Sequence, residues 1–317
     1  MSHVDPFTDL PDLASRLLGG SVVHANDEFF AGRENLVKPG AARHDPTAFG
    51  DKGKVYDGWE TRRRRTPGND HAIIRLGVPG EVHGVVLDTS WFTGNFPPEA
   101  SVEGVDLGGY PSVAELLDAD WVTLVPRSKV AGDTANAFPV AEPRRVSHVR
   151  LSIYPDGGVA RLRVHGRAVP ERALLTGTVD LAALENGGDV VDCSDAFYGS
   201  ARNMLMPGRA RSMADGWENA RRRDDGNDHV VVRLAGRAAV RRLVVDTSYF
   251  VGNAPDSVAV RGLADDGNWV ELLPRTRVQP DTRHQLEPVT DTVVAQVRLD
   301  VYPDGGVARF RVLGELV

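Results

Sequence analysis

Apolar and polar residues alternate over short stretches along most of the chain, which is the period-two pattern of half-buried β-strands. Apolar residues at positions 149, 151 and 153 alternate with Arg150, Ser152 and Tyr154, and residues 160–164 continue the pattern. Denser apolar runs, such as residues 71–77 and 229–236, are typical of the central strands of a sandwich. Turns rich in glycine, proline and asparagine separate these segments at intervals of about 8–12 residues. The sequence therefore predicts an all-β, antiparallel sandwich architecture.

Only a few segments are predicted to be helical. They are residues 9–18, residues 111–117 and a short connecting helix within residues 169–185. The Pro-Asp-Gly-Gly sequence at residues 155–158 lies between two alternating segments. It predicts a β-hairpin turn there, because glycine readily adopts a positive φ.

The two halves of the chain repeat each other in sequence. Residues 57–60 (DGWE) recur at residues 215–218, and residues 68–71 (GNDH) recur at residues 226–229. The first copy is longer, with one insert between residues 102 and 121 and another around residues 43–52. Ordered blocks separated by loop-sized inserts indicate duplicated domains. We predict two tandem homologous jelly-roll sandwich domains, residues 1–170 and residues 171–317, with residues 171–187 as a linker.

The composition favours a small ligand over a macromolecular one. The 317-residue chain suits two domains of about 150 residues, and its formal net charge is −7. Arginines nevertheless cluster at residues 62–65 and 221–223. Small basic clusters on an acidic protein favour a small anionic ligand, and we predict no nucleic-acid partner.

The sequence also predicts where the protein resides. A single cysteine, Cys193, allows no intramolecular disulfide, and we predict that it is a packing residue. The first 20 residues lack the pattern of a signal peptide. No apolar stretch approaches the ~18 residues that cross a membrane. We therefore expect a cytoplasmic protein with no membrane partner.

Residues 57–70 combine three acids, a tryptophan and four consecutive arginines in a predicted loop. A guanidinium group binds a carboxylate through two parallel hydrogen bonds, so these arginines could form an anion pocket with Trp59 as its wall. The alternative is a structured loop, held by arginine–carboxylate pairs and packed under the tryptophan. The corresponding loop of the second copy keeps three of the four arginines.

Two further candidates have structural alternatives of their own. Asp88 and Asn95 follow an apolar strand and could bind a polar ligand, but Asp88 could instead cap its own turn. His71, beside Asp70, could exchange protons near neutral pH, or it could be a strand-edge histidine with a satisfied hydrogen bond.

The combined motifs resemble the allantoicase family. The resemblance rests on residues 57–65 (DGWETRRRR), on Gly-Asn-Asp at residues 68–70, and on residues 88–97, with Phe-Thr-Gly-Asn-Phe-Pro at 92–97. The duplicated halves and the N-terminal segments 13–16 and 23–30 add to it. It covers about residues 10–313. The resemblance implies two galactose-binding-like jelly-roll domains, a homo-oligomer, and hydrolysis of allantoate to ureidoglycolate and urea in purine (allantoin) catabolism.

Chemical reasoning about that reaction selects the candidate residues. The candidate catalytic residues are Glu60, His71 and Asp88, and the candidate substrate-binding residues are Trp59, Arg64, Arg65, Asn95, Arg222, Arg223 and Asn253. The first copy has the fuller arginine run, so we predict that it binds the substrate. No histidine or cysteine pair has metal-ligand spacing, and we expect no cofactor, although ligands from distant loops could still converge on a metal ion. The competing hypothesis is a non-catalytic sandwich that binds carbohydrate or another small ligand.

Overall fold

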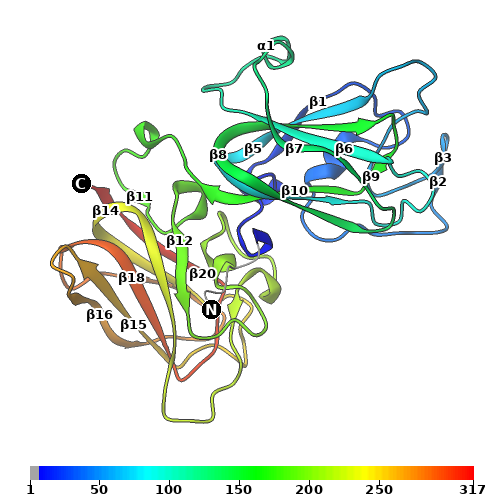
Figure 1. Cartoon of the computed structure of the whole chain (residues 1–317). Helices are drawn as coiled ribbons and strands as arrows, with labels where there is room; N and C mark the ends of the chain where they lie inside the picture. The colour runs from blue at the N-terminus through cyan, green and yellow to red at the C-terminus, as the bar shows by residue number, and fades with distance from the viewer. Residues whose placement is uncertain (1–6) are drawn as a thin grey trace. The chain divides into compact units, whose positions relative to one another are not determined.

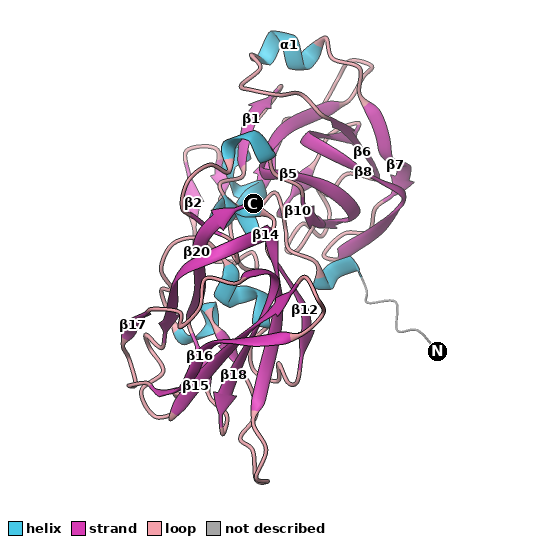
Figure 2. Ribbon diagram, turned by 90° about the vertical axis from the view of Figure 1, so that its left-hand side faces the viewer, coloured by secondary structure: helices cyan, strands magenta, loops and turns pink. Residues whose placement is uncertain are grey.

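Strands are the main secondary structure of the protein, and its helices are short (Figures 1 and 2). The structure is a computed structural model that describes residues 7–317. The chain divides into two compact units, Met1–Val169 and Pro170–Val317, one residue away from the predicted boundary. The prediction of an all-β protein built from two repeats is confirmed. No helix within residues 7–317 is long and apolar enough to cross a membrane.

The first repeat contains ten strands and one α-helix among the described residues. Its elements are β1 (Ser21–Ala25), β2 (Phe49–Gly50), β3 (Gly53–Lys54), β4 (Trp59–Glu60), β5 (Asp70–Asp88), β6 (Glu99–Val105), α1 (Val113–Leu117), β7 (Val122–Lys129), β8 (Ala135–Tyr154), β9 (Gly158–Val159) and β10 (Arg161–Ala168). Three short 3-10 helices, η1 (Phe7–Asp9), η2 (Arg16–Leu18) and η3 (Arg33–Val37), complete it.

The second repeat follows the same plan and also contains ten strands among the described residues. Its strands are β11 (Val179–Asp180), β12 (Asp189–Cys193), β13 (Trp217–Glu218), β14 (Asp228–Asp246), β15 (Ser257–Ala264), β16 (Trp269–Arg277), β17 (Arg283–Leu286), β18 (Val293–Tyr302), β19 (Gly306–Val307) and β20 (Arg309–Leu316). Its 3-10 helices are η4 (Arg172–Leu174), η5 (Leu184–Asn186), η6 (Ala201–Leu205) and η7 (Met213–Asp215).

One long strand organises each repeat. The first half of β5 pairs with β1 and with the end of β8, and its second half pairs with β10 and with the start of β8. In the second repeat, β14 pairs with β12 and β18 through its first half and with β17 and β20 through its second half. Ile73, Ile74 and Leu76 of β5 are buried in the core, as the dense apolar run predicts.

The structure corrects the predicted hairpin. Strands β8 and β10 both pair with β5, so residues 155–158 do not join two adjacent strands. Instead, β9 pairs with β4, and Asp156 accepts a hydrogen bond from the backbone of Arg64 at 2.7 Å. A turn sequence shows where the chain reverses but not which strand it then joins.

One predicted helix is confirmed and two are wrong. Helix α1 lies within residues 111–117 and begins with a capping box formed by Ser112 and Glu115. Residues 9–18 form only the turns of η1 and η2, because Leu13 between them donates to the Val164 carbonyl at 2.8 Å. The connecting segment forms η4 and β11 rather than an α-helix.

The predicted linker is largely part of the second repeat. Leu181 is fully buried and donates to the Val312 carbonyl at 2.7 Å, which is the same contact that Leu13 makes in the first repeat. Strand β11 also pairs with β20. The segment from β11 to η5 therefore forms part of the second repeat rather than a linker.

Candidate active site

A buried tryptophan supports each arginine loop from the core. Trp59 and Trp217 have no exposed surface. Their indole Nε1 atoms donate to the carbonyl oxygens of Asp27 at 2.7 Å and Asp195 at 2.8 Å. Trp59 therefore lies beneath the loop, which is the structural alternative, and does not form the wall of a pocket.

Asp88 and its counterpart Asp246 cap turns. The Oδ1 atom of Asp88 accepts hydrogen bonds from the Ser90 backbone at 2.8 Å and from its hydroxyl at 2.5 Å. Asp246 makes the same two contacts with Ser248 at 2.9 and 2.6 Å. The structure thus places Asp88 in the capping role that the sequence left open.

The capped turn brings an asparagine to a glutamate in each repeat. The Nδ2 atom of Asn95 donates to Oε1 of Glu60 at 2.6 Å, and Asn253 donates to Glu218 at the same distance. Burial raises the pKa of Glu60 above its ordinary value, while the hydrogen bond from Asn95 opposes this rise. These two predicted residues do lie together.

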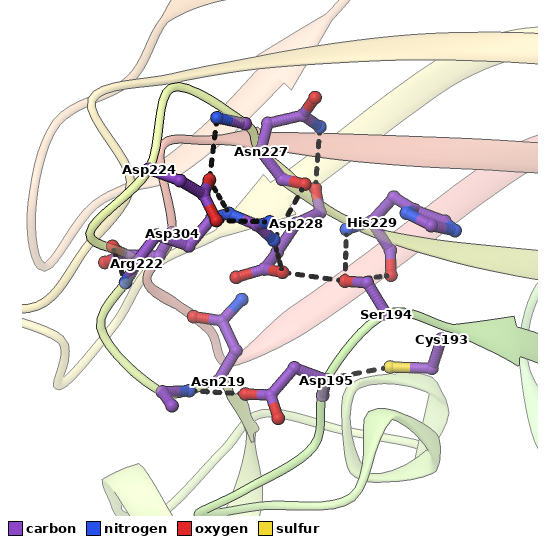
Figure 3. Close-up of polar contacts among 12 residues, drawn as sticks. Cys193, Ser194, Asp195, Asn219, Arg222, Asp224, Asn227, Asp228, His229 and Asp304 are labelled. Atoms are coloured by element: carbon purple, nitrogen blue, oxygen red, sulfur yellow. Dashed lines mark hydrogen bonds and ion pairs between the residues drawn. The ribbon is translucent and has the colours of Figure 1, made fainter.

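Two of the predicted anion-binding arginines are occupied by carboxylates of the protein itself. Arg64 pairs with the buried Asp70 through Nη1 at 2.5 Å. Arg222 binds Asp228 through Nη1 at 2.6 Å and Asp224 through Nε at 2.9 Å (Figure 3). These arginines therefore hold the loop in shape. Arg65 and Arg223 are exposed, and neither lines the cavity described below.

His71 lies away from the Glu60–Asn95 pair, at the start of β5. Its ring centroid is 5.4 Å from that of His24, and its Nε2 atom is buried without a hydrogen-bond partner among residues 7–317. Burial lowers the pKa of His71, and the neighbouring His24 and Arg150 lower it further. No hydrogen bond within the described chain joins His71 to Glu60.

A cavity of about 900 Å³ opens at the loop edge of the second repeat. The Glu218–Asn253 pair lies in its wall, and Arg221 lies beside them. Its wall also includes Tyr198, Asn219, Arg222, Asp256, Arg277 and Asp304. The predicted acid–amide pair thus faces a cavity in the second copy, whereas the sequence favoured the first.

The first repeat has a cavity of about 970 Å³ in a different place. It is lined by residues of the insert that carries α1 and by Arg144 and Arg145 of β8. None of the predicted site residues lies in its wall. Its size alone therefore does not connect it with the loop motifs.

Sequence reasoning missed Glu218, Arg221, Asn219 and Tyr198 as cavity residues. Arg221 and its counterpart Arg63 recur in both loops, so the repeat marks the position. The Arg222 side chain pairs with Asp228 of the same loop, and the Arg222 backbone donates to Asp304, which is far along the chain. The sequence shows that carboxylates lie near the arginine run but not which arginine pairs with them.

The donor set of the described residues does not suggest a metal centre. No group of three or more histidine, cysteine, aspartate or glutamate side chains within residues 7–317 is arranged to hold a metal ion. The polar groups of the cavity are instead guanidinium, amide and carboxyl groups, which recognise small polar anions through hydrogen bonds.

Fold and site together define a two-repeat β-sandwich protein with an acid–amide pair and arginines in a polar cavity. The allantoicase repeat model matches residues 11–169 and 179–317. A "Probable allantoicase" of Nocardia farcinica is 57% identical over 98% of this chain and 95% of its own length. One of Streptomyces coelicolor is 50% identical over 98% of this chain and 87% of its own length.

A crystal structure points to the same family. The allantoicase of Saccharomyces cerevisiae superimposes with a TM-score of 0.80 at 36% identity, covering 96% of this chain and 92% of that one. The chain belongs to the allantoicase family.

Proposed function

We propose that this member of the family hydrolyses allantoate to ureidoglycolate and urea in the cavity of the second repeat. The observation that carries the proposal is the placement of the Glu218–Asn253 hydrogen bond and Arg221 in one cavity wall. The names of its relatives supply the substrate. A non-catalytic carbohydrate-binding role is not favoured, because those relatives are named as enzymes.

Allantoate is a carboxylate whose α-carbon carries two ureido groups. Releasing one of them as urea requires a cation for the carboxylate, an acid for the departing nitrogen and a base for water. The cavity offers a group for each task. Arg221 binds the carboxylate, with Arg277 as a second cation in the wall.

Glu218 and Asn253 act at the reacting carbon. In its carboxylic acid form, Glu218 gives its proton to the departing ureido nitrogen. The carbon–nitrogen bond then breaks, urea leaves, and the remaining ureido nitrogen donates its electron pair to form an acyliminium. The Glu218 carboxylate next takes a proton from water as the water oxygen bonds to this carbon. Ureidoglycolate forms and Glu218 is again protonated, so one residue serves as both acid and base.

Asn253 orients this glutamate and contacts the substrate. Its Nδ2 donates to Oε1 of Glu218 and so fixes the carboxyl group. An amide oxygen accepts hydrogen bonds, so Oδ1 of Asn253 is suited to an N–H of the retained ureido group.

The direct test is urea release from allantoate by the purified protein. The proposal predicts stoichiometric urea and ureidoglycolate. A protein that releases no urea, but is stabilised by a simple sugar in a thermal-shift assay, favours the binding alternative.

We also propose that the enzyme acts in the cytoplasm as a homo-oligomer without a nucleic-acid partner. The family resemblance supports the oligomer, and the net charge of −7 supports the absence of a nucleic-acid partner. Light scattering on the purified protein tests whether it is an oligomer, and a mobility-shift assay tests whether it binds nucleic acid.

A further inference from the structure

The wall of the second-repeat cavity contains a buried amide that the proposed reaction has not used. Asn219 is only 4% exposed, and its Oδ1 accepts the Gly305 N–H at 2.7 Å. Its Nδ2 atom is buried and has no hydrogen-bond partner within residues 7–317. A buried donor left unpaired is costly, so this atom requires a physical explanation.

Asn219 belongs to a closed ring of contacts, most of which Figure 3 shows. Asp304, the residue before Gly305, accepts from the Arg222 backbone at 2.7 Å, and Arg222 in turn pairs with Asp228. From Asp228, the contacts lead back to Asn219 through the consecutive residues Ser194 and Asp195. Ser194 donates to Oδ1 of Asp228 at 2.9 Å, and Asp195 accepts from the backbone of residue 220, next to Asn219.

A second unpaired atom lies on the same ring. Asp228 is 1% exposed, and its Oδ2 is buried without a partner among the described residues. In Figure 3 the amide nitrogen of Asn219 points toward the carboxyl group of Asp228. One donor and one acceptor therefore lie inside one ring of polar contacts. A single water molecule, which accepts one hydrogen bond and donates another, satisfies both.

We infer that Asn219 is a further positioning residue of the enzyme and acts through a bridging water on Asp228. Asp228 binds the Nη1 atom of Arg222, which directly follows Arg221 in the chain. The water bridge therefore connects Asn219 in the cavity wall, through Asp228 and Arg222, to the loop that positions Arg221 for the substrate carboxylate. Losing the bridge loosens substrate binding and leaves the proton transfers by Glu218 in place.

The first repeat shares the unpaired acceptor but lacks the donor. Oδ2 of Asp70 is also buried without a partner among residues 7–317, but Thr61 occupies the position of Asn219 and is 3% exposed. Its hydroxyl accepts from the Gly157 N–H at 3.2 Å and donates to the Gly157 carbonyl at 3.5 Å. Threonine has a single hydroxyl donor, so none remains for a bridge to Asp70. Positions 61 and 219 can therefore be compared directly, because the same backbone structure accommodates threonine in one repeat and asparagine in the other.

The test exchanges the two residues, and it rests on the proposed function. N219T and T61N are compared with the wild type for KM and kcat of urea release from allantoate, and for the thermal midpoint. N219T is expected to raise KM about fivefold or more with kcat changed less than twofold, since a lost hydrogen bond is worth about 1 kcal/mol. T61N is expected to change neither constant. An unchanged KM in N219T, or an equal rise in T61N, overturns the inference.

Two further measurements separate the ways in which this inference could fail. If N219T does not fold, N219A, which removes the amide donor without adding a charge, must raise KM in the same way, and an unchanged KM overturns the inference. If the wild type releases no urea, the proposed function fails, and a high-resolution crystal structure decides on the water. Density within hydrogen-bonding distance of both Asn219 Nδ2 and Asp228 Oδ2 supports the bridge, and its absence overturns it.

Discussion

The side-chain amide of Asn253 donates to the carboxyl group of Glu218 at 2.6 Å, and Asn95 donates to Glu60 at the same distance. Duplication has kept this pair in both halves, while the residues around it have diverged. Tyr198, Asn219 and Asp256 of the second copy correspond to Phe30, Thr61 and Pro98 of the first. The two repeats therefore provide matched positions for testing each proposed role.

Replacing Arg221 tests the carboxylate contact. R221A is expected to raise KM for allantoate about 10- to 100-fold with a smaller change in kcat, because a hydrogen bond between charged groups is worth about 1.5–3 kcal/mol. The check is steady-state urea release. R63A, the same change in the first repeat, is the control and should alter KM less than threefold. Equal effects of the two variants contradict the assignment of the cavity.

Much of this architecture could be predicted from the sequence, because strand periodicity and the duplication are both local patterns. The recurring motifs also predict Glu60, Asn95 and Asn253 as site residues, but they predict neither the Glu–Asn hydrogen bond nor the role of Glu218. The predictions that failed depend on which partner each side chain binds in the folded loop. Arg64 and Arg222 bind Asp70 and Asp228, each six residues further along the chain, and Trp59 turns inward to the carbonyl oxygen of Asp27. Pairing of this kind decides which side chains of a polar loop remain for a ligand, and the order of residues alone does not show which arginine pairs with which acid.

A buried ion pair in the first repeat should be important for stability. Arg161 is 2% exposed, and its Nη2 binds Asp57 at 2.6 Å. D57N is expected to lower the free energy of unfolding by about 3 kcal/mol, because it leaves a buried cation unpaired. Chemical denaturation monitored by fluorescence measures this change.

The second repeat supplies the control for that experiment. Arg309 takes the place of Arg161 but bonds to carbonyl oxygens, while the carboxylate of Asp215 binds the exposed Arg211. D215N should therefore cost less than about 1 kcal/mol. A loss in D215N as large as that in D57N shows that the buried pair is not the cause.

Stability should depend on pH through His148. Burial, reinforced by the nearby Arg75, lowers the pKa of His148 from 6.5 to about 4. As the pH falls below 6.5, the unfolded chain binds a proton that the folded protein excludes. The contribution of His148 is therefore fully present above pH 6.5 and is lost as the pH falls toward 4. At about 1.4 kcal/mol per pKa unit, it amounts to about 3 kcal/mol.

The variant H148Q removes this titration and introduces the residue that the second repeat has, Gln296. We expect its unfolding midpoint to fall less between pH 6.5 and pH 4 than that of the wild type. Parallel curves for the two proteins exclude His148 as the group responsible.

The reaction is expected to proceed without a metal ion. In the proposed mechanism, Arg221, Glu218 and Asn253 supply the binding, acid–base and orienting groups. No group of three or more potential ligand side chains within residues 7–317 is arranged to hold a metal ion. Dialysis against a chelator, followed by assay in metal-free buffer, should leave kcat within twofold of its initial value. A loss of activity that manganese or zinc restores contradicts this expectation.

The central claim is that Glu218 acts as acid and base in the second-repeat cavity. The most direct measurement compares kcat/KM for urea release from allantoate in the wild type, E218Q and E60Q. The account predicts at least a ~100-fold loss in E218Q, as is typical for removal of an acid–base group, and less than a threefold loss in E60Q. Wild-type rates in E218Q, or a larger loss in E60Q, would contradict it.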